Sequence, residues 1–171
     1  MIVHLCGNLG AGKTTTAHAM QARAGWPVVS VGRLRNTVQD EDRVWAEVVP
    51  RLWRAWDSPF LIPGRTGIWV STGLNWRELV AWERHAPRYV FRVWLTAPVT
   101  VLRQRFSVRQ TGNEGYWPYQ DTAADLLERF LRYDSAAVPL PWPTDLQVNT
   151  ATMPVEDVVD LIISRCRRGI K

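Results

Sequence analysis

The stretch 4–18 reads HLCGNLGAGKTTTAH, and it decides which fold we expect for this chain. The apolar run 2–6 predicts a buried strand, and the pattern over 13–24 predicts a helix that ends before Gly25. A glycine-rich turn, a lysine and three threonines connect the two. Glycines allow backbone N–H groups to curl toward one concavity, and the helix adds the positive end of its dipole. This stretch therefore predicts a phosphate-binding turn between a strand and a helix.

Residues 7–14 match the pattern G-x-x-x-x-G-K-[ST] without a gap. Lys13 is expected to reach the β- and γ-phosphates of a nucleotide, and the Thr14 hydroxyl is expected to ligate Mg²⁺. We therefore predict binding of ATP or GTP together with Mg²⁺. The residues predicted to hold the nucleotide are Gly7, Asn8, Leu9, Gly10, Ala11, Gly12, Lys13, Thr14 and Thr15.

Strand and helix patterns alternate along the rest of the chain. Strands are expected over 2–6, 27–31, 68–70, 89–95 and 145–149. Helices are expected over 13–24, 40–56, 75–86, 98–109, 121–136 and 154–166, with a break or kink at Pro50. Such alternation predicts an α/β fold whose parallel sheet is covered by helices on both faces. Ligands in such folds bind outside the carboxyl ends of the strands.

The glycine-rich motif in this setting resembles that of the P-loop kinases. The stretch VSTGLNWRELVAWE at 70–83 is also similar to a segment of the polynucleotide kinases and their small P-loop kinase relatives, and the resemblance covers residues 1 to about 112. It implies a three-layer P-loop NTPase fold with about five parallel strands in the order 2-3-1-4-5. The length of the chain predicts a single kinase domain over 1–171. A GTPase switch is disfavoured because the chain has no NKxD-type motif.

The segment SVGRLR at 30–35 lies where such kinases contact the group that accepts the phosphoryl. Arg35 matches an arginine of the polynucleotide kinases, but Gly32 and Ser71 stand where that family has aspartates. A hydroxyl acceptor gains from a general base, whereas a phosphate acceptor is already anionic and needs positioning. The pattern favours a phosphorylated acceptor, and it leaves open a base supplied by the acidic residues 40–42 or a chain that transfers poorly.

Two further arginines, Arg105 and Arg109, are four residues apart and therefore share one face of the predicted helix. They lead into a glycine-containing loop. The resemblance implies that this loop belongs to a lid, about residues 109–120, whose arginines close over the phosphates. The predicted catalytic residues are thus Lys13, Arg35, Arg105 and Arg109.

The composition agrees with a protein that binds an anionic partner. The chain has 171 residues, with 21 Lys and Arg against 16 Asp and Glu, which gives a net charge of +5. This charge suits a nucleotide, a phosphorylated metabolite or nucleic acid. We expect no signal peptide and no membrane span, and we expect a reducing cytoplasm in which Cys6 and Cys166 are buried thiols.

The sequence thus predicts an ATP-dependent kinase that phosphorylates a nucleoside, a nucleotide or a related small phosphorylated acceptor. One alternative is a polynucleotide 5′-hydroxyl kinase. A second is a regulatory protein that binds ATP without transferring its phosphoryl group.

Overall fold

The protein is described by a computed structural model, which covers residues 1–58, 66–85, 89–109, 122–135 and 138–168. Its strands are β1 (Ile2–Gly7), β2 (Val28–Ser30), β3 (Gly67–Val70), β4 (Val90–Thr96) and β5 (Leu146–Asn149). They form one five-stranded sheet in the order β2-β3-β1-β4-β5, and every pair is parallel. The predicted sheet and strand order are confirmed.

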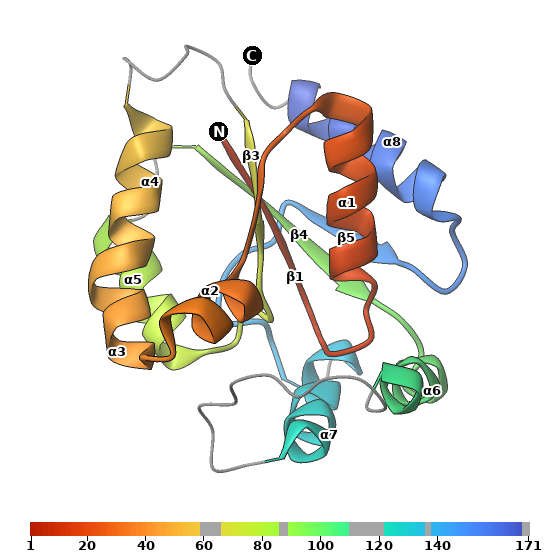
Figure 1. The fold of residues 1–171 in the computed structure, drawn as a ribbon. Coiled ribbons are helices and arrows are strands. Elements are labelled where there is room, and N and C mark those ends of the chain that lie inside the picture. The colour runs from red at the N-terminus through yellow and green to blue at the C-terminus, as the bar shows by residue number, and fades with distance from the viewer. Residues whose placement is uncertain (59–65, 86–88, 110–121, 136–137, 169–171) are drawn as a thin grey trace.

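Helices cover both faces of this sheet. They are α1 (Lys13–Ala24), α2 (Val31–Val38), α3 (Glu41–Arg43), the π-helical turn η1 (Val44–Val48), α4 (Val49–Asp57), α5 (Trp76–His85), α6 (Val99–Arg109), α7 (Ala123–Asp134) and α8 (Val155–Arg168). Helices α1 and α8 pack together on one face, and α4 and α5 pack on the other (Figure 1). The predicted layers, helix–sheet–helix, are therefore present.

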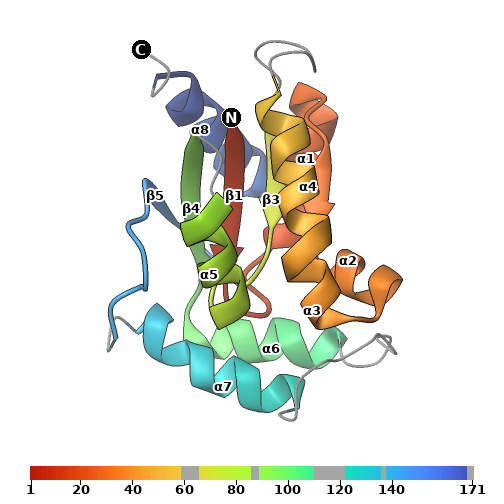
Figure 2. The same cartoon turned by 90° about the vertical axis from the view of Figure 1, so that its left-hand side faces the viewer.

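Strand β1 lies at the centre of the sheet and carries the phosphate-binding turn at its end. It pairs with β3 on one side and β4 on the other, so that Leu5 faces Val70 and Cys6 faces Trp94. All of its residues are buried, as expected for a strand covered on both faces. Helices α6 and α7 cross beyond the carboxyl ends of the strands (Figure 2). The turn is thus placed between the sheet and these two helices.

The two faces have different cores. Aliphatic side chains such as Leu5, Met20 and Ile162 fill the space under α1 and α8. Under α4 and α5 the packing is aromatic: the rings of Trp53 and Trp82 lie 4.1 Å apart between centroids. Large aromatic surfaces stabilise a core strongly because each buries much apolar area. Many of the tryptophans are therefore structural.

The predicted helix over 40–56 is divided into α3, η1 and α4, and α4 begins just before Pro50, where a break or kink was expected. One local feature differs from the sequence-based expectation. Helix α2, over 31–38, was not predicted.

Cys6 and Cys166 are buried free thiols, as predicted. None of the helices within the described residues has the length and apolar character needed to cross a membrane.

Candidate functional site

The phosphate-binding turn connects β1 to α1 in a conformation that requires glycine. Gly7 has φ +143° and Gly10 has φ +82°. A Cβ atom on Gly7 would lie 2.2 Å from the carbonyl oxygen of Leu95, and one on Gly10 would lie 2.8 Å from that of Leu102. The turn therefore fits closely against the end of β4 and against α6, and side chains larger than hydrogen at these positions would displace it.

Lys13, the first residue of α1, folds back over the turn. Its Nζ donates to the carbonyl oxygens of Gly7 at 2.9 Å and Asn8 at 2.7 Å. Thr14 and Thr15 follow in the same helical turn, and both are exposed. The ammonium group and the two hydroxyls therefore surround the positive end of the α1 dipole, which is a suitable arrangement for phosphate oxygens.

Asn8 uses its side chain to attach the turn to α7. Its Nδ2 donates to the Asp134 carboxylate at 3.0 Å and to the carbonyl oxygen of Leu127 at 3.2 Å. Thr96, at the end of β4, donates to the other carboxylate oxygen of Asp134 at 2.9 Å. Burial raises the pKa of Asp134 above its ordinary value, although these hydrogen bonds oppose the shift. Sequence reasoning missed Asp134, because no local motif marks a residue that acts across the fold.

A hollow of about 740 Å³ opens on the side of the turn nearest β5, and we call it the β5-side hollow. Gly10, Gly12 and Thr15 line it together with Gln104, Arg105 and Thr150. Its remaining walls are largely aliphatic. A polar end at the turn and an apolar body are typical of a pocket that holds a nucleotide base and ribose.

Arg105 joins α6 to the loop after β5. Its guanidinium donates to the Thr150 hydroxyl at 2.9 Å and to the Thr150 carbonyl oxygen at 3.0 Å. It therefore lines the β5-side hollow beside the turn, and its predicted closure over the phosphates stays a prediction. Arg109 ends α6, but its side chain and the rest of the predicted lid, residues 110–120, lie outside the described residues.

A second hollow, of about 580 Å³, opens on the side of the turn nearest β2, and we call it the β2-side hollow. Leu9, Lys13 and Thr14 form one wall, and Gly32 and Ser71 lie on another. No Asp or Glu occurs among the described residues that line it. Its cationic side chains are those of Lys13, Arg35, Arg77, Arg129 and Arg132.

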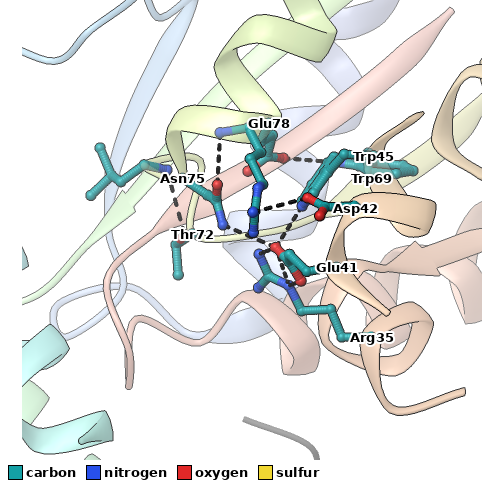
Figure 3. Close-up of polar contacts among 10 residues, drawn as sticks. Arg35, Glu41, Asp42, Trp45, Trp69, Thr72, Asn75 and Glu78 are labelled. Carbon is teal, nitrogen blue, oxygen red and sulfur yellow. Dashed lines mark hydrogen bonds and ion pairs between the residues drawn. The ribbon is translucent and has the colours of Figure 1, made fainter. Parts of the chain in front are cut away.

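Arg35 is held in the β2-side hollow by a buried carboxylate, that of Glu41 (Figure 3). Its Nε donates to Glu41 Oε2 at 2.8 Å, and its Nη2 donates to Oε1 at 2.8 Å. Trp45 Nε1 and Asn75 Nδ2 donate to the same Oε1 at 2.6 and 3.2 Å. Glu41 is only 6% exposed, so it does not lie in a solvated helix start. It orients Arg35 and Asn75 toward the hollow.

The neighbouring acidic residues are also engaged. Asp40 caps α3 by accepting from the backbone N–H of Arg43 at 3.0 Å, and Asp42 pairs with Arg77 at 2.9 Å. None of the three acidic residues at 40–42 is among the described residues lining the β2-side hollow. The structure thus provides no direct support for the predicted recruitment of a base from this stretch.

Comparisons with solved structures show the same fold in small kinases. A gluconokinase from Sinorhizobium meliloti 1021 matches with a TM-score of 0.59 and 17% identity, over 97% of this chain and 91% of that chain. A shikimate kinase from Acinetobacter baumannii, in complex with shikimate, matches with a TM-score of 0.60 and 13% identity, over 98% and 93%. A sugar kinase from Janibacter sp. HTCC2649 matches with a TM-score of 0.62 and 21% identity, over 97% and 94%.

No protein-family model matches the chain, and no curated protein matches it. The structural matches extend over almost the whole length of both chains, but their sequence identities are low. They show that this chain shares the fold of these kinases.

Proposed function

We propose that the protein is an Mg-ATP-dependent kinase that transfers the γ-phosphoryl group to a small anionic acceptor, such as a nucleotide or a phosphorylated or acidic sugar. The observation that carries this proposal is the meeting of two hollows at one phosphate-binding turn. Thr15 lines the β5-side hollow, whereas Lys13 and Thr14 line the β2-side hollow. A nucleotide switch needs only the first hollow, whereas a phosphotransferase needs both.

The residues of the turn have distinct proposed roles. When bound, Mg-ATP supplies the phosphoryl group and the charge-neutralising cation. Lys13 would hold the β- and γ-phosphates, and the exposed Thr14 hydroxyl would hold Mg²⁺. Within the described part of the chain, no group of three or more His, Cys, Asp or Glu side chains is placed to bind a metal. This donor set fits Mg²⁺, which keeps several waters and is bound largely through substrate phosphates.

The lining of the β2-side hollow supports an anionic acceptor. Its described charged residues are all cationic, and Arg35 is held in place by the buried carboxylate of Glu41, which lies outside the lining. Arginine forks bind carboxylate and phosphate groups with paired hydrogen bonds. The names of the structural neighbours, which include a gluconokinase and shikimate kinases, agree with an acceptor of this size and charge.

The proposal is tested by measuring ADP formation with matched acceptors. D-gluconate and D-glucose differ in charge, and CMP and cytidine form a second such pair; shikimate and a 5′-hydroxyl oligothymidylate complete the set. We expect an anionic small molecule to stimulate ADP formation and its neutral partner to do so far less. Stimulation by the oligonucleotide alone would favour a polynucleotide kinase. Tight ATP binding without stimulation by any acceptor would favour the regulatory alternative.

A variant locates the acceptor. Arg132→Ala removes a cation from the β2-side hollow and is expected to raise KM for the stimulating acceptor about tenfold while leaving KM for ATP within twofold. Arg54→Ala, on the exposed side of α4, is the matched control and should change neither constant. An equal rise in KM for ATP would place Arg132 outside the acceptor site.

A further inference from the structure

Two buried polar residues, His4 and Glu78, lie directly behind the wall of the β2-side hollow. Ser71 follows β3 and lines the hollow, although it is only 5% exposed. Its hydroxyl lies 2.8 Å from Nε2 of His4, which is fully buried in β1. Glu78, on α5, is 1% exposed, and its Oε1 lies 3.5 Å from the same His4 nitrogen. Ser71 is therefore the point at which this pair reaches the hollow.

The hydrogen positions in this cluster follow from its partners. Nδ1 of His4 is buried and has no hydrogen-bond partner among the described residues. Burial lowers the pKa of His4, so the imidazole is neutral at pH 7 and carries one hydrogen. Placing that hydrogen on Nε2 avoids a buried N–H without an acceptor. Nε2 then donates to Ser71, and the Ser71 hydroxyl hydrogen is left to turn toward the Glu78 carboxylate, which lies 3.5 Å from the same His4 nitrogen.

Glu78 is in its carboxylate form. Burial by itself would raise the pKa of Glu78, but its interactions with His4, Ser71 and Trp69 outweigh burial and lower it. The Trp69 indole N–H donates to Oε1 at 3.0 Å (Figure 3). The Arg92 guanidinium also acts on this cluster by lowering the pKa of His4, and burial and the Glu78 carboxylate raise the pKa of the nearby Cys6 thiol. A proton acceptor is thus kept inside the protein, one hydroxyl away from the β2-side hollow.

The described lining of the β2-side hollow offers no carboxylate or imidazole that could take up a proton directly. Its described lining contains no Asp, Glu or His, and Gly32 provides no side chain. A hydroxyl that attacks phosphorus must release its proton as the new bond forms, and a positioned acceptor for that proton typically accelerates the step by about 10²–10⁴-fold. Ser71 is a lining residue with a hydroxyl, and this hydroxyl lies 2.8 Å from His4, which is itself 3.5 Å from the buried carboxylate of Glu78.

We propose that the reacting group of the acceptor is a hydroxyl and that its proton passes through Ser71 to Glu78. The acceptor oxygen forms a bond to the γ-phosphorus, while the bond from that phosphorus to the bridging oxygen of ADP breaks and ADP leaves with the electron pair. The acceptor proton moves to Ser71 Oγ, and the Ser71 hydrogen moves to Glu78, which becomes a neutral acid. His4 is a positioning residue that holds Ser71 Oγ. This inference rests on the proposed kinase function.

The relay is tested with variants of its central hydroxyl. Ser71→Ala removes the hydroxyl, and Ser71→Thr keeps one. With D-gluconate or shikimate as acceptor, Ser71→Ala is expected to lower kcat by about 10²-fold and to leave KM for ATP within twofold. Ser71→Thr is expected to keep at least one third of the wild-type kcat. Ser164→Ala removes an exposed serine hydroxyl on α8 and serves as the control.

Glu78→Gln tests the far end of the relay and should reproduce the kcat loss of Ser71→Ala. If this variant fails to fold, the two Ser71 variants decide the question. ADP formation without added acceptor is also measured. Water is then the attacking hydroxyl group, and both variants are expected to show the same loss of kcat.

Each outcome separates the relay from the kinase function. The relay alone is overturned if the wild-type protein is active and the kcat of Ser71→Ala is within twofold of the wild-type kcat. Turnover of CMP to CDP alone, as identified by phosphorus NMR, also overturns it, because the attacking group is then a phosphate oxygen. A wild-type protein that forms no ADP under any condition refutes the proposed function, and the relay with it.

Discussion

Replacement of Glu41 by alanine tests whether this buried carboxylate holds the β2-side hollow together. Arg35 is 12% exposed and Glu41 is 6% exposed, so the pair is largely removed from water. Removing one partner of such a pair leaves the other charge buried without its partner and typically costs about 3–5 kcal/mol. Glu41→Ala also removes the acceptor of the Trp45 and Asn75 hydrogen bonds. For a chain of this length, such a loss lowers Tm by about 10 °C.

The assay is chemical and thermal unfolding of the full chain, followed by circular dichroism. Glu47→Ala is a matched control, because Glu47 precedes α4 on the same helical segment but pairs with Arg43 and Arg51 at the surface. Such exposed pairs contribute less than about 1 kcal/mol. The interpretation is refuted if Glu41→Ala and Glu47→Ala lower Tm by the same amount.

A double-mutant cycle separates the ion pair from the other contacts of Glu41. Arg35→Met combined with Glu41→Leu removes both charges and replaces them with apolar groups. This double variant is expected to be more stable than Glu41→Leu alone, because it leaves no charge buried without its partner. Additive losses would show that Arg35 and Glu41 do not depend on each other.

Two more variants test the phosphate-binding turn and the buried histidine. Gly10→Ala is expected to weaken ATP binding at least tenfold in a nucleotide titration, whereas Gly25→Ala, also at positive φ but with no atom within 4 Å of the added Cβ, should bind ATP normally. Because burial lowers the pKa of His4, only the unfolded chain takes up this proton below pH 6.5, and folding stability falls as the pH decreases from 6.5. The loss of folding free energy is measured in denaturant titrations between pH 7.5 and 5.5. His4→Gln should reduce this loss by up to about 1.4 kcal/mol per pH unit. His85→Gln, at an exposed position, is the control and should leave the loss unchanged.

The regular part of the fold was predictable because its signals are local. The apolar runs that became β1 and β4, and the helix pattern that became α1, are encoded in neighbouring residues. A break was also expected at Pro50, and the π-helical turn η1 changes to the α-helix α4 just before this residue. Helix α2 was missed because Gly32 and the polar residues after it weaken the helical pattern.

The site was predictable where it is a continuous motif and was not where distant segments meet. Lys13 and Thr14 follow from their spacing to Gly7, and the structure places them in the lining of the β2-side hollow. The partners of Asn8 and Arg35 could not be inferred, because Asp134 is 126 residues away from Asn8 and Glu41 looks like part of an exposed acidic turn. Such contacts depend on the packing of whole elements and leave no periodic trace in the sequence.

The most direct test of the account follows the γ-phosphoryl group itself. The protein is incubated with ATP labelled at the γ-phosphorus and with D-gluconate, shikimate or CMP, and the labelled products are separated. We predict that the wild-type protein moves the label to one of these acceptors and that Lys13→Ala lowers this transfer by at least about 10²-fold while remaining folded. Arg23→Ala, at an exposed position of α1, should transfer normally. Label that stays in ATP, label that appears only as inorganic phosphate, or equal transfer by Lys13→Ala would contradict the account.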